Sequence, residues 1–201
     1  MIVIIDYGVG NLRSVYNALT RLGFTVSVSD SPKDINDSRG IILPGVGAYR
    51  DAMKSLEDRG LVDCIKENVS EGKPILGICL GMQLLYEKSY EDGVWNGLGL
   101  LKGEIVRFDN SVKVPHMGWN KLYEGTADPI GSQVSNDEYV YFVHSYYLKT
   151  NNPKEVIFWT NYGVDVPAVV RQNNIIGMQF HPEKSGNTGL KLLKNFGELI
   201  T

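Results

Sequence analysis

Short apolar segments alternate with amphipathic ones through the first half of the chain, and this alternation limits the possible folds more than any other feature. The apolar segments are rich in β-branched residues, which is typical of short buried strands, and they span 2–6, 24–28, 40–43 and 75–78. Apolar residues at helical spacing fill the intervals, at 12–22, 49–56, 62–69 and 80–86. Asn11 is a suitable N-cap for the first of these helices, and Gly23 stands where its C-terminal glycine belongs. Alternation of this kind predicts a parallel sheet with helices on both faces.

The second half of the chain changes to strands separated by polar turns. We expect strands over 99–108, 112–119, 138–148, 156–159, 168–171 and 175–180, and one closing helix over 189–199. No segment has the composition of an interdomain linker. We therefore expect a single α/β domain over residues 1–201, with a mixed, largely parallel central sheet, helices on both faces and antiparallel strands contributed by the second half.

Composition argues against several classes of function. Lys and Arg number 20 against 23 Asp and Glu, and a net charge of −3 without a basic cluster argues against nucleic acid as the main ligand. The apolar start of the chain lacks a basic segment and ends at Asp6, unlike a signal peptide, and no apolar stretch approaches the roughly 20 residues of a membrane span. We therefore expect a cytoplasmic protein whose two cysteines, Cys64 and Cys79, are free thiols.

The segment Gly77-Ile78-Cys79-Leu80-Gly81 lies between a predicted strand and a predicted helix. It is a G-x-C-x-G form of the nucleophile elbow, a tight turn that presents its central residue above the carboxyl ends of the strands. The start of the helix favours an ionised thiol, and the N–H of Leu80 is placed to stabilise an oxyanion. Most free cysteines are small buried core residues, which is our interpretation of Cys64, but the flanking glycines favour a nucleophile at Cys79.

A cysteine nucleophile works best with an imidazole partner, and the chain has three histidines, His116, His144 and His181. Their separation does not match the spacing of zinc ligands. His181 follows the apolar strand 175–180, so it lies at the end of the sheet where α/β folds place their chemistry. Glu183 is two residues further on and can orient the ring from the same side.

These residues resemble the class I, triad-type glutamine amidotransferases, through the segments 77–83 and 179–183. Four further segments, 6–11, 44–48, 115–120 and 141–146, are similar more narrowly to the glutaminase subunits of imidazole glycerol phosphate synthases. Together the segments cover the chain in the family's order. The resemblance implies the flavodoxin-like fold of class I amidotransferases and a single amidotransferase domain.

The resemblance also implies a reaction. Cys79 attacks the carboxamide of glutamine, His181 protonates the departing ammonia, and Glu183 holds His181. Water then cleaves the glutamyl thioester and glutamate leaves. Ammonia passes to a separate (βα)8-barrel cyclase subunit, which forms imidazole glycerol phosphate and an aminoimidazole carboxamide ribotide in histidine biosynthesis. No metal or organic cofactor is implied.

Further site residues follow from the matched segments of the family. For the oxyanion hole they are Leu80, Val46 and Gly47. For glutamine they are Gly47, Gly81, Gln83, Glu91, Ser145 and Tyr146. For the cyclase interface they are Asn11, Met117, Trp119, Tyr141 and Lys184. Glu91 also lies in an acidic stretch that is typical of an ordinary surface, and Trp119 and Tyr141 also suit packing on alternating strands.

The oxyanion loop departs from many relatives, because it reads Pro44-Gly45-Val46-Gly47 where they carry two adjacent glycines. A rotated peptide that exposes a second N–H can require positive φ, which costs a β-branched residue about 1–3 kcal/mol. We hypothesise that the hole is unformed in the free subunit and that the cyclase, with its substrate bound, completes it.

Two other functions share the elbow. One is a different cysteine hydrolase on the same scaffold, such as a stand-alone amidase, which would not need the segments 115–120 and 141–146. The other is a binding subunit in which Cys79 does no chemistry. Labelling of Cys79 by a glutamine analogue, and glutamine turnover with and without the cyclase, separate the three functions.

Overall fold

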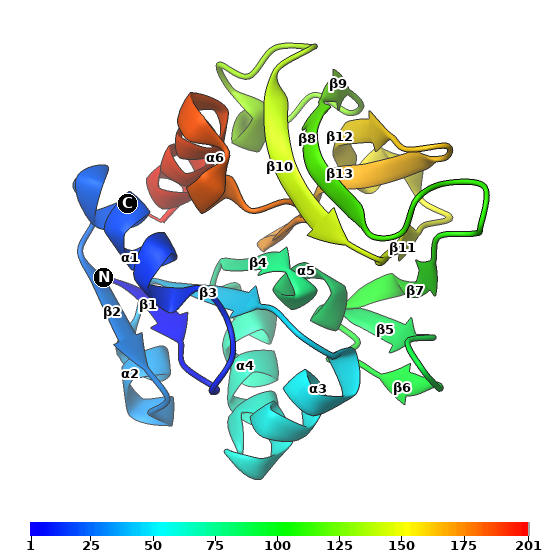
Figure 1. The fold of residues 1–201 in the computed structure, drawn as a ribbon. Helices are drawn as coiled ribbons and strands as arrows, with labels where there is room; N and C mark the ends of the chain where they lie inside the picture. Colours follow the sequence, from blue (N-terminus) through cyan, green and yellow to red (C-terminus); the bar gives the residue numbers. More distant parts are fainter. Residues whose placement is uncertain (201) are drawn as a thin grey trace.

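The computed structural model describes residues 1–200 and is built around one eight-stranded mixed sheet (Figure 1). The strands follow the order β2, β1, β3, β4, β14, β13, β12, β9. The first five of these lie parallel to their neighbours, and the last three continue the sheet in antiparallel fashion. Their bounds are Val26–Ser29, Ile2–Ile5, Gly40–Gly45, Ile75–Cys79, Ile175–Met178, Asp165–Gln172, Val156–Asn161 and Tyr123–Glu124.

Helices cover both faces of the parallel half, as Figure 1 shows. Alternate residues of β1 belong to two separate cores: Val3 packs with α3 and α4, and Ile4 packs with α1 and α6. The helices are α1 (Leu12–Arg21), α2 (Pro32–Asp37), α3 (Tyr49–Asp58), α4 (Leu61–Ser70), α5 (Leu80–Leu84) and α6 (Gly186–Glu198). The predicted α/β architecture is confirmed. Its physical reason is that wholly apolar strands need helices on both faces of the sheet to keep them from water.

Two smaller sheets flank the end of the central sheet that holds the elbow. One is the antiparallel ribbon of β8 (His116–Lys121) and β10 (Tyr139–His144). The other joins β11 (Tyr146–Lys149), β7 (Leu101–Arg107), β5 (Tyr86–Ser89) and β6 (Trp95–Asn96). The short 3₁₀ helices are η1 (Pro129–Gly131), η2 (Pro153–Glu155) and η3 (Pro182–Lys184).

Some predicted elements differ from the observed ones at their ends. The strand predicted over 138–148 is two strands, β10 and β11, which part at Ser145 and join different sheets. The helix predicted over 80–86 ends at Leu84, because Tyr86 begins β5. The helix α2 and the strands β5, β6 and β9 are short elements with little periodicity, and the sequence pattern did not indicate them.

Asn11 occupies the N-cap position of α1, but its side chain makes no capping hydrogen bond. The expectation of a side-chain cap was therefore wrong in its detail, because the amide of Asn11 binds the carboxylate of Glu183 instead. Gly23 follows the last turn of α1 with φ +89°, as expected of a glycine that ends a helix.

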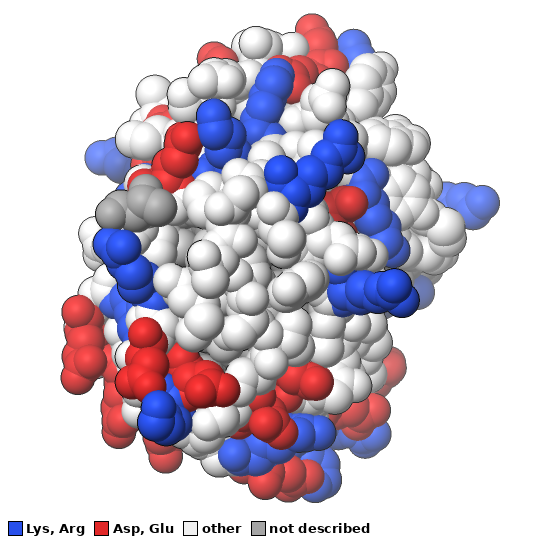
Figure 2. Space-filling view, turned by 90° about the vertical axis from the view of Figure 1, so that its left-hand side faces the viewer, with Lys and Arg blue, Asp and Glu red and all other residues white. Residues whose placement is uncertain are grey.

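On the face that carries α1 and α6, positive and negative side chains lie in separate areas. Figure 2 shows Lys and Arg gathered mainly above, Asp and Glu mainly below, and a broad uncharged area between them. Among the helices of residues 1–200, none combines the length and apolar character that a crossing of a membrane requires.

Candidate active site

The nucleophile elbow predicted at Cys79 is present where β4 runs directly into α5. Cys79 has φ 54° and ψ −112°, a conformation that costs a non-glycine residue roughly 1–3 kcal/mol and must be held by its surroundings. The two glycines explain how the turn is held. A Cβ at Gly77 would lie 2.6 Å from the carbonyl oxygen of Gly81, and a Cβ at Gly81 would overlap the carbonyl of Leu43 in β3.

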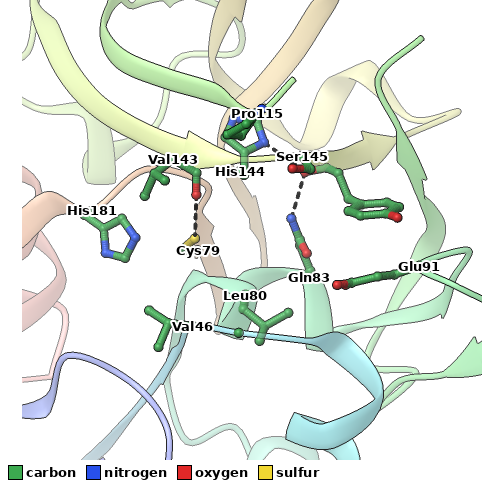
Figure 3. A pocket seen from close by; sticks show the side chains of 12 residues that line it. Val46, Cys79, Leu80, Gln83, Glu91, Pro115, Val143, His144, Ser145 and His181 are labelled. Carbon is green, nitrogen blue, oxygen red and sulfur yellow. Dashed lines mark hydrogen bonds between the residues drawn. The ribbon is translucent and has the colours of Figure 1, made fainter. Parts of the chain in front are cut away.

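His181 and Glu183 lie in the segment that follows β14. Because β14 pairs with β4, this segment ends beside the elbow. The Nδ1 atom of His181 lies 2.9 Å from Oε1 of Glu183, and both side chains are almost wholly buried, with 3% and 0% exposed. Asn11 donates a second hydrogen bond of 3.3 Å to the same carboxylate oxygen. The His181 ring is turned toward Cys79 in Figure 3.

The electrostatics of His181 follow from its two partners. Burial of the imidazole opposes its positive charge, but the interactions with Cys79 and Glu183 outweigh this and raise the pKa of His181 to about 9. The ring is therefore protonated at neutral pH in this arrangement. A protonated imidazole beside the sulfur is suited to give its proton to a leaving amine.

A cavity of about 460 Å³ opens beside the sulfur, which is within the range of roughly 300–1,000 Å³ typical of small-molecule sites. Nine of the residues expected at the site line it; they are Val46, Gly47, Cys79, Leu80, Gln83, Glu91, Ser145, Tyr146 and His181. Gly81 does not line it, because its place is under β3, where it allows close packing of the elbow. Glu183 lies behind His181, away from the cavity wall.

Three wall residues were not expected from the sequence: Pro115, Val143 and His144. The carbonyl oxygen of Val143 lies 3.8 Å from the sulfur of Cys79, and a dashed line marks this contact in Figure 3. Gln179 lies in the segment 179–183 but is not among the predicted site residues. Its amide Nε2 lies 4.0 Å from the same sulfur, and its Oε1 accepts from Gln83 at 3.0 Å. The period of two between Gln179 and His181 was a signal that both side chains face Cys79.

The carboxylate of Glu91 binds a backbone N–H and also faces the cavity. Its Oε2 accepts from the backbone N–H of Tyr49 at 3.2 Å, at the start of α3. Its carboxylate also lines the cavity and points toward Gln83 in Figure 3. Burial raises the pKa of Glu91, and a half-buried carboxylate in a pocket is the type of group that binds an ammonium.

The loop predicted to form the oxyanion hole follows β3, and Leu80, the other predicted donor, begins α5. Gly47 carries the positive φ of this loop, +92°, and Val46 does not have a positive φ. Val46 is 41% exposed and lines the cavity, so it is not packed on the sheet. The base of the loop is fixed by Tyr7, whose hydroxyl donates to the carbonyl of Pro44 at 2.6 Å.

The residues expected at the cyclase interface occupy the outer side of the β8–β10 ribbon and its neighbourhood. Met117 and Trp119 are 62% and 56% exposed on β8. The ring of Trp119 packs edge-on against Tyr141 of β10, with centroids 6.0 Å apart. Lys184 is exposed at the end of η3, whereas Asn11 is half-buried against Glu183.

Cys64 has a different environment from Cys79. It is buried in α4, with its sulfur 3.5 Å from Oδ1 of Asn36, and burial raises its pKa. Within residues 1–200, no group of three or more His, Cys, Asp or Glu side chains is placed to hold a metal ion.

Comparison with known proteins agrees with this geometry. Residues 3–199 match the family model described as glutamine amidotransferase class-I. The imidazole glycerol phosphate synthase subunit HisH of Caldanaerobacter subterraneus subsp. tengcongensis is 50% identical over 200 residues, which cover all of this chain and 98% of that one. HisH of Carboxydothermus hydrogenoformans is 50% identical over 202 residues, with complete coverage of both chains. The chain belongs to the class I glutamine amidotransferases, and within them to the HisH family.

Two solved structures share the fold. A crystal structure described as a glutamine amidotransferase superposes with a TM-score of 0.79 at 22% identity, covering 100% of this chain and 99% of that one. The structure of PurLQS from Thermotoga maritima gives a TM-score of 0.76 at 24% identity, covering 100% and 98%. At these identities the likeness concerns the fold, whereas the match to HisH concerns the family.

Proposed function

We propose that this chain is the glutaminase subunit of an imidazole glycerol phosphate synthase, which hydrolyses glutamine to glutamate and ammonia for histidine biosynthesis. The observation that carries the proposal is the buried Cys79–His181–Glu183 arrangement at the wall of a cavity large enough for an amino acid. Full-length identity of 50% to HisH subunits supports the specific pathway.

The chemistry assigns one role to each triad residue. His181 carries the proton of the Cys79 thiol while the sulfur forms a bond to the carboxamide carbon of glutamine, and the carbonyl oxygen takes the negative charge opposite the N–H of Leu80. His181 gives its proton to the nitrogen as the carbon–nitrogen bond breaks, and ammonia leaves. A water molecule, deprotonated by the same imidazole, then attacks the thioester and releases glutamate and free Cys79. Glu183 keeps the ring oriented and stabilises its positive charge.

The substrate-binding residues divide the cavity into two ends. Leu80 and the loop at Val46 and Gly47 border the reacting carbon. Gln83 and Glu91 lie further along, where Glu91 meets the ammonium of glutamine. The backbone of Ser145 and Tyr146 closes the wall, and the lining of the cavity by all these residues supports this assignment.

The partner we propose is a (βα)8-barrel cyclase subunit that docks on the exposed ribbon face at Met117, Trp119 and Tyr141, with Lys184 and Asn11 nearby. Exposed aromatic and methionine side chains are common anchors of protein interfaces. Val143 lines the cavity and is paired with Met117 in the ribbon, so a partner docked here borders the cavity, and ammonia can pass between subunits without entering bulk water. We place the complex in the cytoplasm.

The test is glutamate release by the purified chain, alone and with a cyclase subunit loaded with its ribotide substrate. We expect slow release alone, marked stimulation in the complex, and loss of both in Cys79→Ala. Formation of the cyclase products from glutamine reports the transfer of ammonia. Equal turnover with and without the cyclase contradicts the assignment as a synthase subunit, and would favour a stand-alone amidase. No glutamine turnover under any condition would favour a binding subunit.

A further inference from the structure

Two buried imidazoles lie beside the cavity and take no part in the chemistry described above. His116 and His144 face each other across the β8–β10 ribbon, where they are paired in register. Both are nearly inaccessible, with 3% and 6% exposed. A buried titratable side chain that touches neither the sulfur nor the triad needs another explanation.

The hydrogen bonds of the pair form a chain with one possible direction. The Nδ1 atom of His144 lies 2.8 Å from the carbonyl oxygen of Tyr146, which can only accept, so Nδ1 carries the hydrogen. The Nε2 atom of a neutral His144 is then an acceptor, and it receives from Nδ1 of His116 at 3.0 Å. Nε2 of His116 in turn accepts from the amide of Asn120 at 3.2 Å. Each ring nitrogen has one suitable partner.

The charge state of the rings is consistent with this chain. Burial lowers the pKa of His116 to about 4. Burial, with the nearby His116 and His181, lowers the pKa of His144 to about 3, against the opposing effect of its bond to Tyr146. Both rings are therefore neutral at physiological pH, and neither adds a positive charge beside the protonated His181.

Packing fixes the plane of His116. Its ring is stacked between Phe142, with centroids 4.6 Å apart, and Tyr162, with centroids 4.0 Å apart. Phe108 lies against His144 at 5.4 Å. Because the rings cannot turn freely, the hydrogen bond from His144 fixes the position of the carbonyl of Tyr146.

That carbonyl is also the anchor of Gln83. Nε2 of Gln83 donates to the oxygen of Tyr146 at 2.9 Å and to Oε1 of Gln179 at 3.0 Å. The side chains of Gln83 and His144 approach the wall from different sides in Figure 3. With its amide nitrogen engaged, Gln83 keeps Oε1 as the polar atom available to accept from a bound glutamine.

We propose that His116 and His144 are positioning residues for glutamine: the neutral pair fixes the Tyr146 carbonyl, and through it the orientation of the Gln83 amide. The inference rests on the proposed function, since it names what holds the substrate-binding wall. It concerns binding and leaves the chemical step at Cys79 unaffected.

Three variants in the complex with the cyclase test the proposal. An asparagine at position 144 keeps an N–H near the place of Nδ1, whereas a glutamine places its amide near Nε2 and withdraws the donor from Tyr146. We expect His144→Gln to raise KM for glutamine roughly 5- to 30-fold, the effect of losing one buried hydrogen bond, and to change kcat by less than about twofold. His144→Asn should keep KM within about threefold of the wild type. His116→Phe keeps a ring between Phe142 and Tyr162 but removes the donor to His144, and it should raise KM as well.

The control is the alkylation of Cys79 by iodoacetamide, which requires no glutamine site and should be unchanged in every variant. A second measurement needs no substitution: nitrogen NMR of the wild-type chain should find both rings neutral and protonated at Nδ1 at pH 7. Equal KM changes in His144→Asn and His144→Gln, a loss confined to kcat, or a hydrogen on Nε2 of His144 would each overturn the proposal. If the wild-type complex hydrolyses no glutamine, it is the proposed function that fails.

Discussion

At the scale of single residues, the site combines a cysteine of strained backbone with an imidazole of raised pKa. The φ of 54° at Cys79 places its sulfur beside His181, Glu183 holds the ring from behind, and Asn11 donates to the carboxylate of Glu183. His181 is buried, yet its interactions with Cys79 and Glu183 raise its pKa to about 9. This arrangement makes the protonation of His181 dependent on Cys79.

The pKa of His181 should fall when the sulfur is removed. The folded pKa of about 9 lies above the ordinary value of 6.5, so the charged ring stabilises the fold fully below about pH 6.5, and this stabilisation is lost as pH rises through about 9. In Cys79→Ala the ring stays buried, which lowers its pKa, and only Glu183 remains to raise it. We expect NMR titration to show a lower pKa for His181, while His116 and His144 remain neutral in both proteins as internal references. An unchanged pKa would mean that Glu183 alone holds the proton.

Val46 is the residue at which the oxyanion loop can be tested. If rotation of the peptide requires positive φ there, Val46→Gly removes a cost of about 1–3 kcal/mol and should raise the glutaminase activity of the free chain roughly 10- to 100-fold. Glutamate release without the cyclase is the measurement. Val46→Ala is the matched control, because alanine has a small side chain but, unlike glycine, still carries a Cβ that disfavours positive φ. A rise of equal size in both variants would assign the effect to the side chain and not to the backbone.

At the scale of elements, the elbow depends on close packing of backbone against backbone. The helix α5 has only five residues and presses on β3 through Gly81, so the short helix is held by packing more than by its own hydrogen bonds. The ribbon residue Val143 contributes the carbonyl that meets the sulfur. The position of Cys79 is thus set by β4, which carries it, and by β3 and β10, which are distant in the sequence.

Gly81→Ala should destabilise the protein strongly, because its Cβ would overlap the carbonyl of Leu43 and the backbone of β3 or α5 must shift. We expect a loss of about 3 kcal/mol or more in the free energy of unfolding, measured by denaturant titration. Gly72→Ala is the control: with φ +92° and open space around it, it should cost only about 1–2 kcal/mol of backbone strain. Equal losses in the two variants would show that contact with β3 is not the cause.

The elements also show what the sequence could predict. Strands such as Ile2–Ile5 and the elbow at Cys79 follow from local apolar pattern and glycine spacing, so they were predicted close to their observed positions. The break at Ser145 was not, because it arises where two consecutive strands pair with β8 and β7 in separate sheets, a long-range choice. The contacts of Gln179 with Gln83 and of His144 with His116 were missed for the same reason, since these partners lie 96 and 28 residues away.

At the scale of the whole molecule, the β8–β10 ribbon joins the outer surface to the cavity. One side exposes Met117 and Trp119, and the other buries His116 and His144, of which His144 lines the cavity. Val143, whose carbonyl meets Cys79, is paired with Met117 in this ribbon. A partner that docks on the outer side therefore contacts the same two strands that border the nucleophile, which gives a physical route for the cyclase to affect the site.

Trp119→Ala should weaken the complex with the cyclase more than it affects the fold. The ring is 56% exposed and packs on Tyr141 only at its edge, so its removal leaves no cavity in the core. An aromatic anchor at the centre of an interface contributes about 2 kcal/mol or more, which predicts an increase in Kd of at least roughly 30-fold by calorimetry. Tyr90→Ala, which removes an aromatic ring that is 41% exposed next to β5, is the matched control and should leave Kd unchanged. If the two variants bind equally well, the cyclase docks elsewhere, and the route through the ribbon is lost with it.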